Sequence, residues 1–184
     1  VYKRQAFYLA SWGMYRGSSF LLQKDYKVHI PVVKIIQEKK YDPLVGICAK
    51  DLCKEQNLAL LEDIGERICE CYAAEGPAID GKVNAASDTL ITKILLGTLG
   101  CVPAYDRYYK ESVKKHHISS GKYNRDSVYR VAKFYCNHED VFERLRLELS
   151  ERRVEYPPMK LMDMCFWQDA YISDSKAATI QRIE

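Results

Sequence analysis

Residues 57–74, NLALLEDIGERICECYAA, carry the clearest structural pattern in the chain. Apolar side chains recur there at helical spacing, which places them on one stripe of a helix, and charged side chains occupy the opposite side. The stripe consists of Leu61, Ile64, Ile68 and Cys71. The pattern therefore predicts an amphipathic helix that buries one face in a core.

The helical period continues on both sides of this segment, and no stretch shows the alternation typical of a strand. Ser87 is a good N-cap for a strongly apolar helix that ends near Leu99. We therefore expect an all-α fold, a compact multi-helix globule of about seven to nine helices in a single domain. Its expected parts are N-terminal helices in 6–75, one of them at 32–40, a second helical part in 82–168 and a frayed polar tail in 172–184.

Composition limits the class of protein. A chain of 184 residues, 47% of them hydrophobic, suffices for a core without disulfides and is too apolar to be intrinsically disordered. No apolar run approaches the roughly 18 residues that a membrane span needs, so no membrane partner is expected. The 28 basic and 25 acidic residues leave a net charge of +3, which is compatible with a polyanionic partner without requiring one.

Cysteine usage indicates a reducing compartment. The chain has seven cysteines, an odd number, scattered without the two-residue spacing of a thiolate metal site. Reduced thiols in a cytoplasmic protein are the simplest interpretation. We therefore expect no metal ion and no cofactor.

Common catalytic motifs are absent: the chain contains no phosphate-binding loop, no nucleophile elbow and no zinc-protease motif. The segment that remains is TLITKILLGTLGCVPAYD, residues 89–106, in which Lys93 is the single lysine of an apolar helix. Burial disfavours an ammonium ion, so Lys93 can have a lowered pKa and act as an amine nucleophile.

Asp106 follows Pro103 at an expected helix start, where free backbone N–H groups keep a carboxylate ionised. The Lys93–Asp106 pair can thus serve an imine-forming reaction in which the carboxylate stabilises a developing cation. In the alternative interpretation, Lys93 extends to the surface and Asp106 only caps a helix.

The order of helical lysine, apolar run, Pro103 and Asp106 resembles the helix-hairpin-helix DNA glycosylase superfamily. The likeness is to the bacterial proteins related to 8-oxoguanine DNA glycosylase. In that group a basic residue, an aspartate and a tryptophan share a late helix. Here the late segment is YPPMKLMDMCFW, residues 156–167, with Lys160, Asp163 and Trp167. The resemblance covers about half of the chain, from 82 to 168.

The resemblance implies a DNA-binding protein that removes a modified purine in base-excision repair. Lys93 would attack the sugar carbon and form a Schiff base, and Asp106 would stabilise the sugar cation or orient the amine.

The chain departs from the family in two respects. The family hairpin usually reads Leu-Pro-Gly-Val-Gly and binds a DNA phosphate through backbone N–H groups, whereas this chain has GKVN at 81–84. The interval from Lys93 to Asp106 is also shorter. A non-catalytic helical module that binds DNA or protein therefore remains the alternative.

The charge distribution adds a second argument for nucleic acid. From Arg107 to Lys133 there are eight basic and two acidic residues, a net charge of +6, with tyrosines interleaved. Basic and aromatic side chains together favour a nucleic-acid backbone, while the alternative is a solvated helix face with half-buried tyrosines. The candidate DNA-binding residues are Arg107, Lys110, Lys114, Lys115, Lys122, Arg125 and Arg130.

A flipped base needs an aromatic or apolar pocket. Tyr105, Phe166 and Trp167 are candidates because they lie near the two matched segments in sequence. Trp12 and Trp167 both lie among apolar neighbours, so core packing is the favoured role for each.

Overall fold

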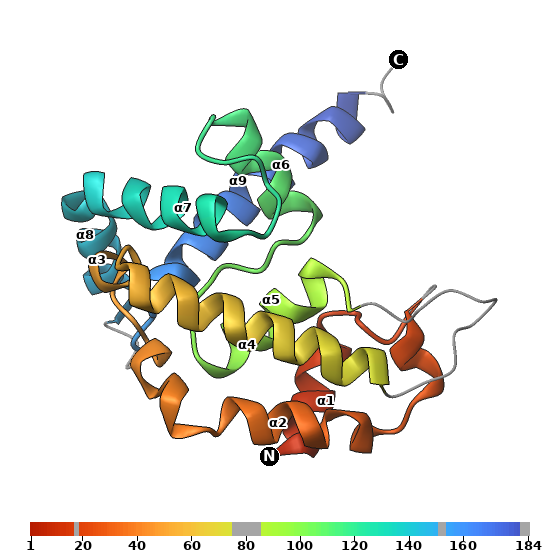
Figure 1. The fold of residues 1–184 in the computed structure, drawn as a ribbon. Helices are drawn as coiled ribbons and strands as arrows, with labels where there is room; N and C mark the ends of the chain where they lie inside the picture. Colours follow the sequence, from red (N-terminus) through yellow and green to blue (C-terminus); the bar gives the residue numbers. More distant parts are fainter. Residues whose placement is uncertain (17–18, 75–85, 151–153, 181–184) are drawn as a thin grey trace.

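A computed structural model describes residues 1–16, 19–74, 86–150 and 154–180. Within these ranges the chain forms helices and turns and contains no strand, which confirms the predicted all-α class (Figure 1). No helix among them combines the length and the apolar character that crossing a bilayer requires. The α-helices are α1 (Tyr2–Ser11), α2 (Ile30–Ile36), α3 (Ala49–Leu52), α4 (Glu55–Ala74), α5 (Asp88–Thr98), α6 (Arg107–Lys115), α7 (Arg125–Asn137), α8 (Glu139–Ser150) and α9 (Pro158–Ile180). Three 3₁₀ helices are η1 (Phe20–Gln23), η2 (Tyr26–His29) and η3 (Lys39–Leu44).

The amphipathic pattern at 57–74 forms α4, which runs across the middle of the molecule (Figure 1). Three members of the predicted stripe, Leu61, Ile64 and Ile68, are buried as expected. Helix α4 contacts α2 and η3 as well as α5 and α7, so it joins the N-terminal helices to the later ones. Burying each of the two isoleucines contributes roughly 1.5–3 kcal/mol.

Helix α5 begins where the sequence predicts, because the Ser87 hydroxyl accepts a hydrogen bond from the backbone N–H of Leu90 at 3.2 Å. Helix α1 packs against α5 at Gly97, where the Tyr8 ring occupies the space that a side chain would need. A larger residue at 97 would push the two helices apart. This close approach brings the C-terminal end of α1 over the middle of α5.

Two expected boundaries differ from the structure. The helix expected at 32–40 is α2, which ends at Ile36, and the chain continues into η3. Helix α9 continues to Ile180, so most of the segment expected to fray is helical. The extension is held by α6, because Arg107 and the Tyr108 hydroxyl both donate hydrogen bonds to Asp174 on α9. The GKVN segment at 81–84 lies outside the described residues.

Candidate active site at Lys93 and Asp106

Lys93 points into the protein from the middle of α5, where every residue from Leu90 to Leu96 is buried. Its side chain is only 7% exposed, so the interpretation in which it extends to open solvent is wrong. The amine has few polar neighbours. Its Nζ donates to the backbone oxygen of Trp12 at 3.4 Å and lies 4.9 Å from the centre of the Trp12 ring. The nearest carboxylate atom is Oδ2 of Asp106, 3.9 Å away.

These neighbours only partly replace the water that a charged Lys93 ammonium loses on burial. Burial lowers the pKa of Lys93 from its ordinary value of 10.5, and the nearby positive charge of Arg16 adds to this effect. The carboxylates of Asp106 and Asp163 oppose it and raise the pKa. Burial is the largest contribution, so the fold increases the share of the neutral amine at a given pH.

The two carboxylate oxygens of Asp106 contact different groups. Its Oδ1 accepts a hydrogen bond from the backbone N–H of Tyr109 at 3.2 Å and caps α6, while its other oxygen faces Lys93. Helix α5 fixes the position of Asp106 through Tyr105, the residue that precedes Asp106 in the chain. The Tyr105 N–H donates to Thr92 Oγ1 at 2.9 Å, and Thr89 Oγ1 donates to the Tyr105 carbonyl at 2.8 Å. The helix that carries the lysine therefore also holds the start of the helix that carries the aspartate.

The late segment, residues 156–167, also lies next to Lys93 and Asp106. On α9, Asp163 Oδ2 accepts from Lys160 Nζ at 2.9 Å, and its Oδ1 accepts from the backbone N–H of Ala104 at 2.9 Å. The Asp163 side chain is only 4% exposed, and burial raises its pKa against the opposing effect of Lys160. Lys160 Nζ lies 5.3 Å from the centre of the Trp12 ring. Trp12 is thus in contact with both lysines of the two matched segments.

A cleft of about 430 Å³ opens beside this cluster, which is within the size range of ligand pockets. Its wall is mainly apolar, with Lys160 and Asp163 as its charged residues and Trp12 and Trp167 as its aromatic ones. Trp167 stacks on Tyr171 with ring centres 4.9 Å apart. Lys93 and Asp106 do not themselves line the cleft, and Trp12 connects the two places because it lines the cleft and contacts the Lys93 amine.

The structure brings one of the three candidate base-pocket residues to the cleft. Trp167 lines it, whereas Tyr105 and Phe166 are buried in the core. The Tyr105 hydroxyl is hydrogen-bonded to Ser127 Oγ at 3.1 Å, and the Phe166 ring packs edge-on against Phe134. Neither ring is available to a ligand in this conformation. Trp12, which sequence reasoning assigned to the core, is half-buried and forms part of the cleft instead.

Ion pairs neutralise part of the basic segment. Arg125 is bound by Glu55 and by Glu62, the latter at 2.7 Å, and both glutamates belong to α4. Arg107 pairs with Asp174 at 2.9 Å. These partners are far away in sequence, so the local count of charges did not include them.

Two more candidates also take part in ion pairs. Arg130 contacts Asp126 at 2.8 Å, and Lys115 contacts Asp169 at 3.4 Å. Among the described residues, the remaining three candidates take part in no ion pair. They are Lys110, Lys114 and Lys122. The exposed positive charge of the segment is therefore smaller than its sequence total.

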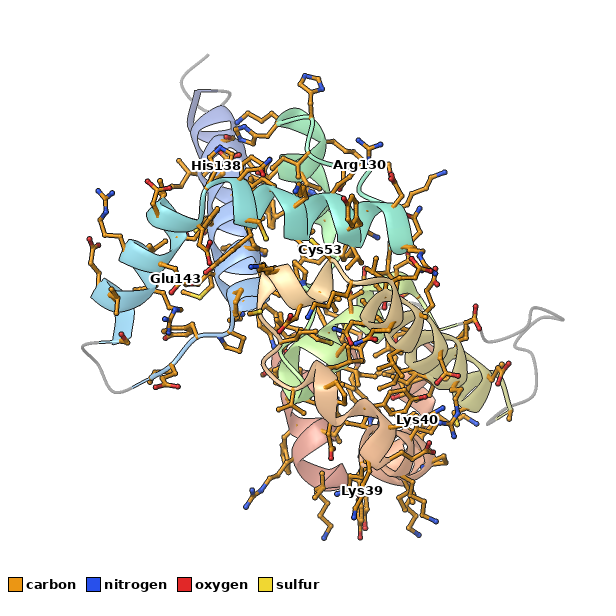
Figure 2. The ribbon with its side chains drawn as sticks, turned by 60° about the vertical axis from the view of Figure 1, so that its left-hand side comes forward. Lys39, Lys40, Cys53, Arg130, His138 and Glu143 are labelled. Atoms are coloured by element: carbon orange, nitrogen blue, oxygen red, sulfur yellow. The ribbon has the colours of Figure 1, made fainter. Side chains whose placement is uncertain are left out.

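Positive charge also occurs elsewhere on the molecule. Figure 2 shows Lys39 and Lys40 on η3 at the end of the molecule opposite to Arg130 on α7. Lys40 pairs with Asp63 at 2.7 Å. Lys39 and Lys40 are exposed, unlike Lys93, and belong to η3 rather than α5, so they are available as controls.

All seven cysteines are free thiols, and no three potential metal-ligating side chains gather among the described residues. Comparison of the chain with protein-family models, with curated proteins and with solved structures gives no match. The likeness to DNA glycosylases therefore rests on the residues of the two matched segments.

Proposed function

We propose that this protein binds DNA in the cytoplasm and breaks the N-glycosidic bond of a modified purine, with Lys93 as nucleophile. The observation that carries the proposal is a buried amine with a lowered pKa, 3.9 Å from the carboxylate of Asp106. Nucleophilic catalysis by lysine needs the neutral amine, and burial promotes that form. The carboxylate of Asp106 supplies the negative charge that stabilises a cationic sugar.

The chemical step follows from these two groups. The lone pair of Lys93 Nζ forms a bond to C1′ of the sugar, and the bond from C1′ to the base nitrogen breaks. The electron pair of that bond leaves with the base, which takes up a proton, while the lysine nitrogen loses one. Opening of the sugar ring then gives an imine between Lys93 and the sugar, which borohydride reduces to a stable amine.

The cleft supports the proposal through its composition. Bases that are removed from the stack bind between aromatic or apolar side chains, and Trp12 and Trp167 are such residues. On α6, Lys110 and Lys114 lie one turn apart without an ion-pair partner among the described residues, so both can contact phosphates. The helix that starts at Asp106 would then connect the reacting group with the DNA backbone.

A second candidate is a non-catalytic module that binds DNA or protein with the same architecture. It is favoured by the ion pairs of Arg107, Arg125 and Arg130, which leave less charge for DNA than the sequence suggests. Under this candidate Lys93 is a structural residue, and its replacement leaves binding unchanged.

Borohydride trapping on a panel of duplexes with different modified purines distinguishes the candidates. We expect a covalent complex with the wild type and with Lys39→Gln, an exposed lysine away from the site, but none with folded Lys93→Gln. Absence of both a trapped complex and base release in the wild type would refute the catalytic proposal. Salt-dependent binding that is equal in the wild type and Lys93→Gln would then favour the module. Absence of binding at low salt would leave a protein-binding scaffold.

A further inference from the structure

The amine of Lys93 cannot be reached from the cleft in this structure. Its side chain is 7% exposed, and Lys93 does not line the cleft. A nucleophile has to come within roughly 3–3.5 Å of the atom that it attacks. A sugar that enters by the cleft can therefore meet the amine only after a group of the cleft wall has moved.

Trp12 is a member of that wall and contacts the amine directly. Its backbone oxygen accepts a hydrogen bond from Lys93 Nζ at 3.4 Å, and Nζ lies 4.9 Å from the centre of its ring. Asp106, which provides the nearest carboxylate, does not line the cleft. Trp12 thus covers Lys93 where the cleft adjoins it.

The backbone of Trp12 is fixed by the end of α1. The N–H of Trp12 donates to the Tyr8 carbonyl at 3.3 Å, and the N–H of Gly13 donates to the Ala10 carbonyl at 2.9 Å. Such bonds satisfy the last carbonyls of a helix and hold the chain that follows. The Trp12 carbonyl therefore stays on the Lys93 amine, and the part of Trp12 that can move is its ring.

The ring is half-buried and is oriented mainly by Tyr8. The side-chain N–H of Trp12 donates a hydrogen bond to the Tyr8 hydroxyl, and the two rings meet edge-on with centres 6.2 Å apart. Tyr8 is itself anchored, because its ring fills the space beside Gly97. Side chains near the surface change rotamer much faster than helices unfold. Rotation of the ring therefore needs the loss of one hydrogen bond and a few ring contacts, without any movement of α1 or α5.

We propose that Trp12 controls access to Lys93: its carbonyl holds the amine in place, and rotation of its ring away from Nζ opens the way from the cleft. The inference deepens the proposed function and rests on Lys93 as the reacting amine. The cover has a chemical use, because an accessible neutral amine reacts with any small aldehyde.

Reductive methylation measures this access without DNA. The neutral amine adds to formaldehyde, water leaves, and cyanoborohydride transfers a hydride to the resulting iminium ion, which gives a methylamine. Peptide mass spectrometry follows each lysine, with the exposed Lys39 as internal reference. We expect wild-type Lys93 to react more slowly than Lys39. Its rate should not change with urea below the unfolding transition, because rotation of one ring exposes little surface.

Three variants test the role of the ring. Trp12→Ala removes the cover and should give the fastest methylation of Lys93. Tyr8→Phe keeps the ring beside Gly97 but removes the acceptor of the Trp12 N–H, so it should accelerate methylation roughly 2- to 10-fold. Trp167→Ala is the matched control, because it removes the other tryptophan of the cleft, which stacks on Tyr171, and should leave the rate at Lys93 unchanged.

The proposal is overturned if wild-type Lys93 reacts as fast as Lys39, or if its rate rises with urea as steeply as unfolding does. It is also overturned if Tyr8→Phe leaves the rate unchanged, which decides the matter even where Trp12→Ala does not fold, or if Trp167→Ala accelerates methylation equally. Because the assay contains no DNA, failure of borohydride trapping on DNA would refute the catalytic proposal and leave these outcomes as they are.

Discussion

Replacement of Lys93 by methionine removes a poorly compensated charge while it keeps an unbranched side chain of similar length. Within the described part of the chain, the groups that replace the water shell of the ammonium are the Trp12 carbonyl at 3.4 Å, the Trp12 ring and a carboxylate oxygen at 3.9 Å. Methionine needs no such shell and packs well in irregular apolar sites. We therefore expect Lys93→Met to be more stable than the wild type at pH 7.

The expected increase in the free energy of unfolding depends on the groups that surround Lys93. Apolar replacement of a whole buried ion pair is commonly neutral or stabilising by about 1–4 kcal/mol, whereas removal of one partner is destabilising when it leaves the other charge buried and unpaired. Asp106 remains behind, but its side chain is 15% exposed and still caps α6, so we expect the lower half of that range, about 1–2 kcal/mol. For a domain of this size this corresponds to a melting temperature about 2–8 °C higher.

The gain should depend on pH. The folded-state pKa of Lys93 is lowered below 10.5, so the unfolded chain binds more protons than the folded protein between the lowered pKa and 10.5. Wild-type stability therefore receives a contribution that rises with pH in this window. Lys93→Met lacks this contribution. Its advantage over the wild type should be full below the window and shrink as the pH approaches 10.5.

Urea unfolding at pH 7 and pH 10 measures both effects, and Lys160→Met is the matched control. Lys160 contacts the same Trp12 ring, but it neutralises Asp163, whose side chain is only 4% exposed. Its loss leaves a buried carboxylate without its cation and should cost about 3 kcal/mol. A Lys93→Met protein that is less stable than the wild type at pH 7, or whose gain grows toward pH 10, would refute the reasoning.

Three further predictions concern charge. Asp106→Asn should lower the pKa of Lys93 further, because asparagine still caps the helix but no longer stabilises the ammonium. NMR titration of labelled lysine measures this pKa, and a higher pKa in the variant would contradict the prediction. Replacing Lys110 and Lys114 by glutamine should each reduce the slope of log affinity for DNA against log salt by about 1, and unaltered slopes would exclude them as phosphate contacts. Burial lowers the pKa of His29 from 6.5 to about 4, so wild-type stability should fall by up to roughly 3 kcal/mol from pH 6.5 to pH 4. Urea unfolding should show a smaller fall for His29→Gln, and an identical fall would contradict the assignment.

Local patterns in the sequence predicted the features that they directly encode. The apolar period at 57–74 gave α4 and its buried stripe, and Ser87 marked the start of α5. The same reasoning placed Lys93 in an apolar helix and Asp106 at a helix start. In each case the information lies within one or two turns of chain.

Features that depend on packing between distant segments were not predictable in this way. Trp12 reaches Lys93 because Tyr8 packs against Gly97, a contact between residues far apart in the chain. The pairing of Arg125 with Glu62 depends on how α7 lies against α4. Neither contact leaves a periodic signal in the sequence, so sequence patterns alone predict a core position for Trp12 and a DNA-binding role for Arg125.

The central claim is that Lys93 is the nucleophile, and mapping of the trapped adduct tests it most directly. The wild-type protein is reduced with borohydride on a duplex that contains a modified purine, digested, and analysed by tandem mass spectrometry. The account predicts a sugar adduct on Lys93 alone. An adduct on Lys160 or another amine, or no adduct on any duplex of the panel, would contradict it.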